Sequence, residues 1–66
     1  MNIQLNGEQK DIGDVRTVAD LLDSLKIGRE RVAVEVNLDI VPRARHAEHV
    51  INDGDRIEIV QFVGGG

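Results

Sequence analysis

The stretch that decides the fold is residues 53–66, Asp53-Gly54-Asp55-Arg56-Ile57-Glu58-Ile59-Val60-Gln61-Phe62-Val63-Gly64-Gly65-Gly66. It opens with the turn sequence Asp-Gly-Asp and then alternates apolar and polar residues, which predicts a strand from Arg56 to Phe62. Three glycines follow. Because glycine loses more backbone entropy on ordering than any other residue, we expect residues 64–66 to form a thin, flexible tail.

Working outward from this strand, the N-terminal end of the chain predicts a β-hairpin. Residues 1–5 alternate apolar and polar side chains, the period of a strand with one buried face. Asn6-Gly7 is a strong signal for a type I′ turn, which needs positive φ at both central positions. Residues 8–12 then return as a more polar strand, which suits the edge of a sheet.

A single helix is predicted after this hairpin. Thr17 is a suitable N-cap, and Asp20 lies at the third position beyond it, where a capping box has its second partner. The helix is expected to end near residues 26–28, with Gly28 just beyond its last turn. The apolar stripe of the helix falls at i, i+3, i+4 and i+7: Val18, Leu21, Leu22 and Leu25.

Two more strands and a loop connect the helix to the last strand. Residues 31–37 alternate around three valines and predict a strand, and residues 40–41 predict a short strand after a tight turn. Residues 43–50 are polar, and we expect a loop with one helical turn. Either Val50 or Ile51 is expected to anchor this loop in the core.

This order of elements predicts an α+β fold. One helix cannot cover both faces of a sheet, so we expect it to pack across one face of a mixed sheet of four or five strands. The first and last strands carry the strongest apolar alternation and are expected to be parallel neighbours at the centre. That arrangement is the β-grasp, or ubiquitin-like roll, over residues 1–63, with residues 64–66 as its C-terminal tail.

The composition restricts the function classes. The chain has no cysteine, which excludes a disulfide framework, a cysteine-rich zinc site and a cysteine persulfide. Its net charge of −4, with acidic and basic residues interspersed, argues against a nucleic-acid partner. No apolar run is long enough to span a membrane, and polar Asn2 and Gln4 interrupt any signal peptide. We therefore expect a cytoplasmic protein without a membrane partner.

The last strand is predicted to have two different faces. If Ile57 and Ile59 face the helix, then Val60 and Phe62 face away from it. Together with Val63, these two residues would form an apolar docking site for a partner directly before the tail. Isolated exposed apolar residues are also normal on protein surfaces, so a patch without a function is the alternative.

The tail itself is the strongest candidate for chemistry. Gly64 and Gly65 have no side chains, so an enzyme could enclose their backbone and recognise it by hydrogen bonds. The carboxylate of Gly66 could then be activated as an acyl-adenylate by attack on the α-phosphate of ATP. The partner would have to supply ATP and Mg²⁺, because this chain has no phosphate-binding loop and no plausible metal site. We predict no catalytic residue and no bound cofactor.

Other polar residues favour structural roles. His46 and His49 are three residues apart, but two histidines without a third ligand make a poor metal site, and we expect solvated or partly packed side chains. Asp53 and Asp55 flank a turn glycine, which is typical of turn chemistry rather than of a catalytic pair.

Several motifs in order resemble the ThiS family of thiamine-biosynthesis sulfur carriers, along essentially the whole chain. They are Val34-Glu35-Val36-Asn37, Ile40-Val41-Pro42-Arg43, Asp53-Gly54-Asp55, Ile57-Glu58-Ile59-Val60 and Val63-Gly64-Gly65-Gly66. The resemblance implies that an E1-like, ThiF-like adenylyltransferase activates Gly66 and that a cysteine desulfurase or another donor converts it to a thiocarboxylate. A ThiG-like thiazole synthase then takes the sulfur. Such a protein is a carrier and co-substrate, not an enzyme.

Two alternatives remain open at this level. One is a sulfur carrier for molybdopterin or another sulfur-containing metabolite. The related small subunit of molybdopterin synthase shares fold and chemistry, although it tends to have a proline before its terminal glycines, whereas this chain has Val60-Gln61-Phe62-Val63. A β-grasp binding module that never modifies its C-terminus is the other, but it would favour a basic or aromatic surface. One departure from the resemblance is His46, where members often carry a large aromatic residue.

Overall fold

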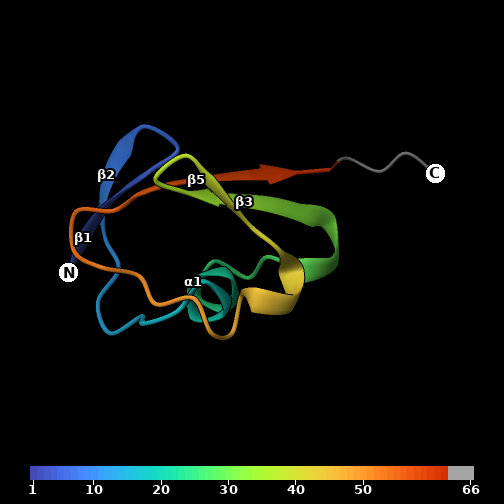
Figure 1. The fold of residues 1–66 in the computed structure, drawn as a ribbon. Coiled ribbons are helices and arrows are strands. Elements are labelled where there is room, and N and C mark those ends of the chain that lie inside the picture. Colours follow the sequence, from blue (N-terminus) through green and yellow to red (C-terminus); the bar gives the residue numbers. More distant parts are fainter. Residues whose placement is uncertain (63–66) are drawn as a thin grey trace.

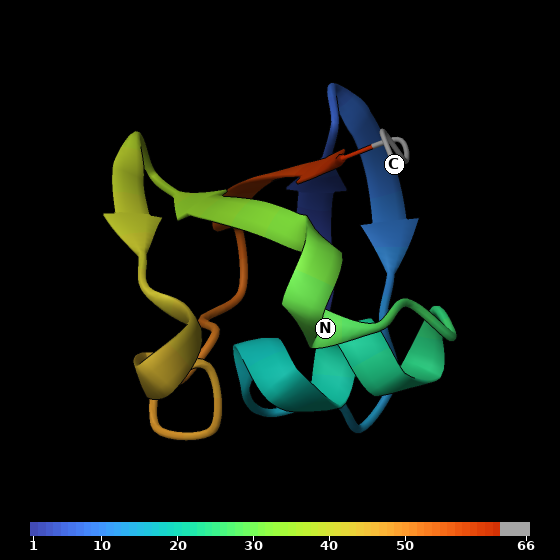
Figure 2. The same ribbon diagram turned by 90° about the vertical axis from the view of Figure 1, so that its right-hand side faces the viewer.

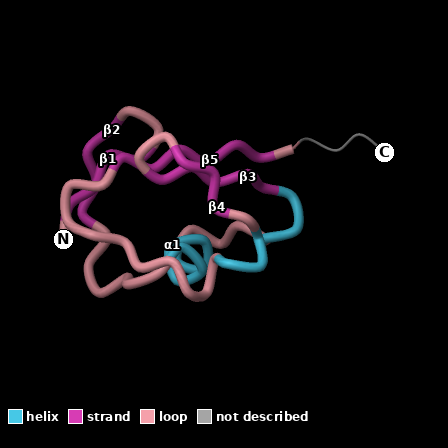
Figure 3. Tube along the Cα trace, viewed as in Figure 1, coloured by secondary structure: helices cyan, strands magenta, loops and turns pink. Residues whose placement is uncertain are grey.

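The computed structural model describes residues 1–62, so the predicted tail and Val63 lie outside the described residues. The strands are β1 (Asn2–Leu5), β2 (Glu8–Asp11), β3 (Val32–Val36), β4 (Asp39–Val41) and β5 (Arg56–Gln61). The helix is α1 (Val18–Ser24), and two short 3-10 turns span Arg29–Arg31 and Arg43–Arg45 (Figure 3).

The strands form one mixed sheet with α1 beneath it, as predicted. Their order is β2-β1-β5-β3-β4, with β1 parallel to β5 and all other neighbours antiparallel. The helix lies across one face of the sheet, and the opposite face is uncovered in this part of the chain (Figure 1). In the turned view, β4 and β2 form the two edges and β5 runs between β1 and β3 (Figure 2). The last strand is therefore the centre of a β-grasp fold.

The first hairpin closes through the predicted turn. Asn6 and Gly7 have φ angles of 50° and 84°, the left-handed values that a type I′ turn requires. The register pairs Leu5 with Glu8 and Asn2 with Asp11. All four residues of β2 are exposed and polar, as expected for an edge strand.

The helix begins as predicted but ends earlier. The Thr17 side chain accepts a hydrogen bond from the Asp20 amide at 3.1 Å, and the Asp20 carboxylate accepts from the Thr17 amide at 3.3 Å. The helix ends at Ser24, and the left-handed residue is Lys26, with a φ of 59°, rather than Gly28. The expected C-terminal position of the glycine was therefore wrong.

A Schellman motif explains this ending. The Lys26 amide donates to the Asp23 carbonyl at 3.0 Å, and the Ile27 amide donates to the Leu22 carbonyl at 2.9 Å. This turn brings Ile27 back onto the core beside Leu22. Burial of an apolar side chain outweighs the cost, of order 1 kcal/mol, of a left-handed lysine.

The core lies between α1 and the helix-facing side of the sheet. Its least exposed aliphatic side chains are Ile3, Val18, Leu21, Leu22, Val34 and Ile57. Ile57 comes from the central strand, and Ile59 is also buried, which confirms that these two residues face the helix. At 66 residues the domain has a single small core, so each of these side chains carries a large share of the stability.

The connection between β4 and β5 is more ordered than its polar sequence suggests. Ile51 is buried and serves as the predicted anchor, whereas Val50 is exposed and forms an isolated bridge with Thr17. His46 is only 1% exposed, and its Nε2 lies 3.1 Å from the Val41 carbonyl, which can only accept. The expected solvated or partly packed side chain is therefore wrong for His46, while His49 is half-buried.

Candidate functional site

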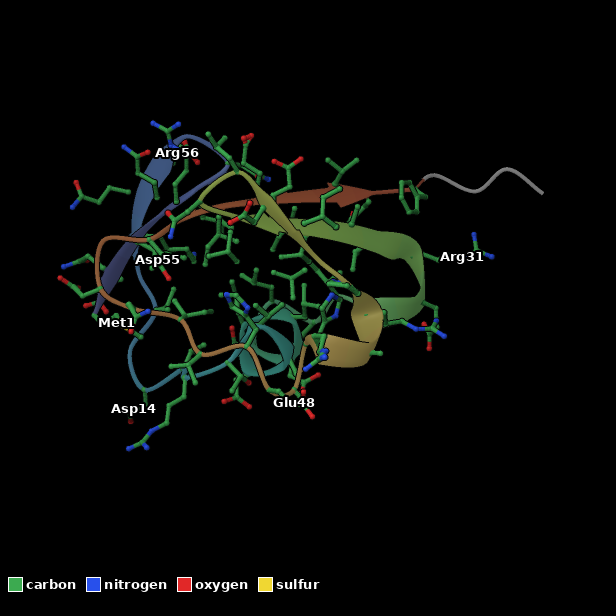
Figure 4. All side chains as sticks on the ribbon, viewed as in Figure 1. Met1, Asp14, Arg31, Glu48, Asp55 and Arg56 are labelled. Atoms are coloured by element: carbon green, nitrogen blue, oxygen red, sulfur yellow. The ribbon has the colours of Figure 1, made fainter. Side chains whose placement is uncertain are left out.

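The start of β5 is fixed by a network around Asp55. Its carboxylate accepts hydrogen bonds from the Asn52 amide at 2.8 Å and from the Asn37 side chain at 3.0 Å. The Asn37 side-chain oxygen in turn accepts from the Arg56 amide at 2.9 Å. Asp55 and Arg56 lie at the end of the sheet opposite Arg31 (Figure 4). The Asp55 carboxylate therefore stabilises the turn through these hydrogen bonds, as predicted.

Asp53 stabilises the same turn from the other side. Its carboxylate accepts a hydrogen bond from the Asn2 amide at 2.8 Å, and the Gly54 amide donates to the Asn2 carbonyl at 2.7 Å. Gly54 has a φ of 87°, which only glycine adopts without strain. The two aspartates therefore bind backbone groups in a turn and do not form a catalytic pair.

The C-terminal half of β5 is held by Asn6 on one side and β3 on the other. The Asn6 side chain accepts a hydrogen bond from the Ile59 amide at 2.8 Å and donates to the Ile59 carbonyl at 3.2 Å. On the other side, the Phe62 amide donates to the Arg31 carbonyl at 2.8 Å. The strand is therefore supported up to the last residue that the structure describes.

The open face of β5 carries the predicted apolar residues. Val60 is 57% exposed and Phe62 is 58% exposed, on the side of the sheet opposite α1. The exposure expected for these two positions is confirmed. Val63, Gly64, Gly65 and Gly66 lie outside the described residues.

Neighbouring strands extend this surface. Ala33 of β3 lies directly across from Val60, and Ile40 of β4 lies across from Glu35 on the same face. Ile40 is 73% exposed. We call Ala33, Ile40, Val60 and Phe62 the apolar patch. Ala33 is half-buried and the other three are exposed. Exposed apolar residues grouped on one face mark interaction surfaces more often than isolated ones do.

Sequence reasoning missed Ala33 and Ile40 as members of this patch. The position of Ile40 could have been predicted. Its neighbour Val41 faces the core, and because successive residues of a strand face opposite sides, Ile40 faces the open side. To predict that Ala33 belongs to the patch, one would need the register between β3 and β5, and no local sequence pattern gives that register.

An unpaired acidic couple adjoins the apolar patch. Glu35 and Glu58 lie directly opposite each other in the register of β3 and β5. Neither carboxylate forms an ion pair within residues 1–62. Like charges directly opposite each other on a sheet are destabilising. The open face thus combines apolar side chains with a concentrated negative charge.

The histidines do not build a metal site. His46 is buried with its Nε2 on the Val41 carbonyl, and within residues 1–62 no group of three or more potential metal ligands occurs. The Nδ1 of His46 has no hydrogen-bond partner in the same part of the chain. In residues 1–62, no helix has the length and apolar character needed to cross a bilayer.

Comparisons with known proteins agree with this architecture. A family model described as the ThiS family matches residues 3–66. The sulfur carrier protein ThiS of Bacillus subtilis is 44% identical over 68 residues, which cover 97% of this chain and 98% of that protein. A crystal structure of the thiamine biosynthesis protein ThiS from Geobacter metallireducens matches with a TM-score of 0.83 and 33% identity over 100% of both chains.

A longer relative places the same domain within an enzyme. A thiazole synthase of Paramagnetospirillum magneticum is 46% identical over 66 residues, which are 100% of this chain but only 20% of that protein. This chain therefore spans one fifth of that relative and the full length of the Geobacter protein. From its family model, full-length relatives and fold, the chain belongs to the ThiS family of ubiquitin-like β-grasp sulfur carriers.

Proposed function

We propose that this chain carries sulfur on the carboxylate of Gly66 and delivers it for thiazole formation in thiamine biosynthesis. Membership of the ThiS family supports the proposal. The observation that carries it is the position of the apolar patch. A central strand, held by hydrogen bonds on both sides, exposes Val60 and Phe62, and only Val63 separates Phe62 from the three glycines.

The chemistry requires activation of a poor electrophile. A Gly66 carboxylate oxygen attacks the α-phosphate of ATP, pyrophosphate leaves, and an acyl-adenylate forms. Hydrosulfide then attacks the acyl carbon, the new C–S bond replaces the C–O bond to phosphate, and AMP leaves. Where the donor is a persulfide, an acyl disulfide forms first, and a thiol reduces it to release the thiocarboxylate. The product is a Gly66 thiocarboxylate, a sulfur donor that needs no cysteine in the carrier.

The partners supply everything except the carboxylate. An E1-like adenylyltransferase binds ATP and Mg²⁺, a cysteine desulfurase or another donor provides sulfur, and a thiazole synthase consumes the thiocarboxylate. The carrier binds no cofactor and contributes no catalytic residue. Support for the thiazole synthase comes from relatives in which this domain and a thiazole synthase are parts of one protein.

Recognition is divided between the sheet and the tail. Val60, Phe62 and Val63, with Ala33 and Ile40 beside them, dock against an apolar surface of the partner. Gly64 and Gly65 pass through a channel too narrow for side chains, where the partner binds their backbone groups. The acidic couple Glu35 and Glu58 favours a partner surface that carries basic residues next to its apolar area.

Isotope exchange between ATP and pyrophosphate tests the activation step. The full-length chain, incubated with the adenylyltransferase, Mg²⁺, ATP and labelled pyrophosphate, should support exchange of label into ATP. A chain that ends at Gly65 keeps the folded domain and a terminal carboxylate but places that carboxylate one residue short. Equal exchange with both chains would show that Gly66 is not the activated residue.

A further inference from the structure

The backbone groups of β5 alternate between two neighbouring strands. The Phe62 amide donates to the Arg31 carbonyl at 2.8 Å, and the Asn37 amide donates to the Arg56 carbonyl at 2.7 Å. Bonded residues recur at every second position of an antiparallel pair. The even-numbered residues of β5 therefore bond to the β3 side, and the odd-numbered residues direct their amides and carbonyls toward β1.

On the β1 side, these groups find partners only as far as Ile59. The Ile57 carbonyl accepts from the Asn6 amide at 2.9 Å, and both backbone groups of Ile59 bond to the Asn6 side chain. β1 ends at Leu5, and the chain then turns into β2. Among the groups that the structure describes, the amide and carbonyl of Gln61 have no partner. In that part of the chain, Gln61 presents one donor and one acceptor in strand geometry.

A groove runs alongside this free edge. Its first part has a volume of about 450 Å³ and is lined by Leu5, Asn6, Leu25, Ile27, Ile59 and Gln61. A second hollow of about 240 Å³ shares Ile27 and Gln61 with the first and continues to Arg31 and Phe62. The lining of the first part includes four apolar side chains beside the free backbone groups of Gln61: Leu5, Leu25, Ile27 and Ile59.

The length of the remaining chain places an enzyme at this edge. Four residues follow Phe62, and even when fully extended they span no more than about 14 Å. In the proposed function, an active site must hold Gly66. The surface of that enzyme must therefore come within about 14 Å of Phe62, the neighbour of Gln61.

We propose that an extended segment of the thiazole synthase, the enzyme that relatives join to this domain in one protein, adds a strand to β5 along this edge. Its backbone bonds to the amide and carbonyl of Gln61, and one of its apolar side chains enters the groove between Leu5 and Ile27. A paired donor and acceptor at a strand edge fit a peptide backbone, which is the basis of recognition by β-strand addition. This inference rests on the proposed function and specifies how the partner is held.

Amide hydrogen exchange of the isotope-labelled chain tests the proposal. On addition of the thiazole synthase, exchange of the Gln61 amide should slow by at least about tenfold, as expected when an open amide becomes hydrogen-bonded. Gln9 is the matched control, since the register of β1 and β2 and the bond from the Ile12 amide to the Met1 carbonyl direct its amide away from the sheet. Its exchange should not change.

A second measurement removes the donor alone. Chemical synthesis can replace the amide of Gln61 by an ester, which lacks the N–H but keeps the side chain. This replacement should weaken binding to the thiazole synthase about five- to tenfold, whereas the same replacement at Gln9 should change binding less than about twofold.

Three outcomes would contradict the inference. A complex in which the Gln61 amide exchanges as in the free chain, or an ester at Gln61 that binds with full affinity, would overturn strand addition and leave the proposed function intact. Protection of Gln61 that appears in the free chain and grows with its concentration would assign the edge to a second copy. Absence of any complex between the unmodified chain and the synthase would contradict the proposed function itself.

Discussion

The side chain of Asn6 hydrogen-bonds both backbone groups of Ile59, a residue 53 positions later in the chain. In this way the turn of the first hairpin takes the place of a neighbouring strand where β1 has already ended. The bond lies three residues before Phe62, so it braces the part of β5 that leads to the C-terminus. The pairing with β3 and the side chain of Asn6 together hold β5 in place as far as Phe62.

Asn6→Gly tests the contribution of this brace. Glycine keeps the positive φ of the turn and removes both hydrogen bonds, so the free energy of unfolding should fall by about 1–3 kcal/mol. Lys26→Gly is the control, because Lys26 also has a positive φ, of 59°, and its side chain forms no hydrogen bond within the described part of the chain. Urea denaturation measures both. Equal losses in the two variants would show that the brace adds nothing beyond the backbone effect of glycine.

Phe62→Asp tests the apolar patch. The side chain is 58% exposed, so the free energy of unfolding should change by less than about 0.5 kcal/mol. Adenylation by the activating enzyme should slow by about tenfold or more, because a charge would be buried against an apolar partner surface. Val50→Asp is the matched control, since Val50 is 59% exposed but lies away from the open face. Identical adenylation rates for the two variants would mean that the patch is incidental.

Glu58→Gln tests the acidic couple. Removing one of two opposed charges should raise the free energy of unfolding by about 0.2–1 kcal/mol. The same change should slow association with a basic partner surface, and the difference between variant and parent should shrink at high salt. Stopped-flow association rates at two salt concentrations measure this. A variant that is more stable and associates as fast as the parent would show that the couple has no role in binding.

The titration of Asp11 tests the electrostatics of the N-terminal edge. The Gly13 amide, which donates to this carboxylate at 2.9 Å, and the Met1 ammonium at 3.4 Å hold the pKa of Asp11 below its ordinary value of 3.8. Because the folded state favours the charged form, the contribution to stability is present above this ordinary value. It is lost as the pH falls through the lower, folded pKa.

Nuclear magnetic resonance titration of the carboxyl group measures this effect. Salt screens the exposed ion pair but not the hydrogen bond from Gly13, which is the larger cause. High salt should therefore remove only part of the lowering of the pKa. A pKa of Asp11 that returns fully to its ordinary value in high salt would contradict the assigned order of causes.

Local patterns predicted the elements that depend on neighbouring residues. The Asn6-Gly7 turn, the Thr17 cap and the two faces of β5 each follow from backbone preferences or alternation within a few residues, and the structure confirms all three. The parallel placement of β1 beside β5 also followed, because those strands carry the apolar alternation of a sheet centre.

Features that depend on tertiary contacts could not be predicted in this way. The helix ends at Ser24, with the left-handed residue at Lys26, because Ile27 returns to the core, whereas a glycine preference alone pointed to Gly28. His46 lies in a polar segment without periodicity, yet it is buried on the carbonyl of Val41. The free edge at Gln61 exists only because β5 extends beyond β1, a comparison of two strand lengths that the sequence does not show.

The most direct measurement is the intact mass of the chain after incubation with the adenylyltransferase, ATP, Mg²⁺ and a sulfide source. Replacement of one oxygen by sulfur, located on Gly66 by fragmentation, is the predicted result. The chain that ends at Gly65 should remain unchanged under the same conditions. Failure of the full-length chain to gain sulfur, or sulfur found on any residue other than Gly66, would contradict the account.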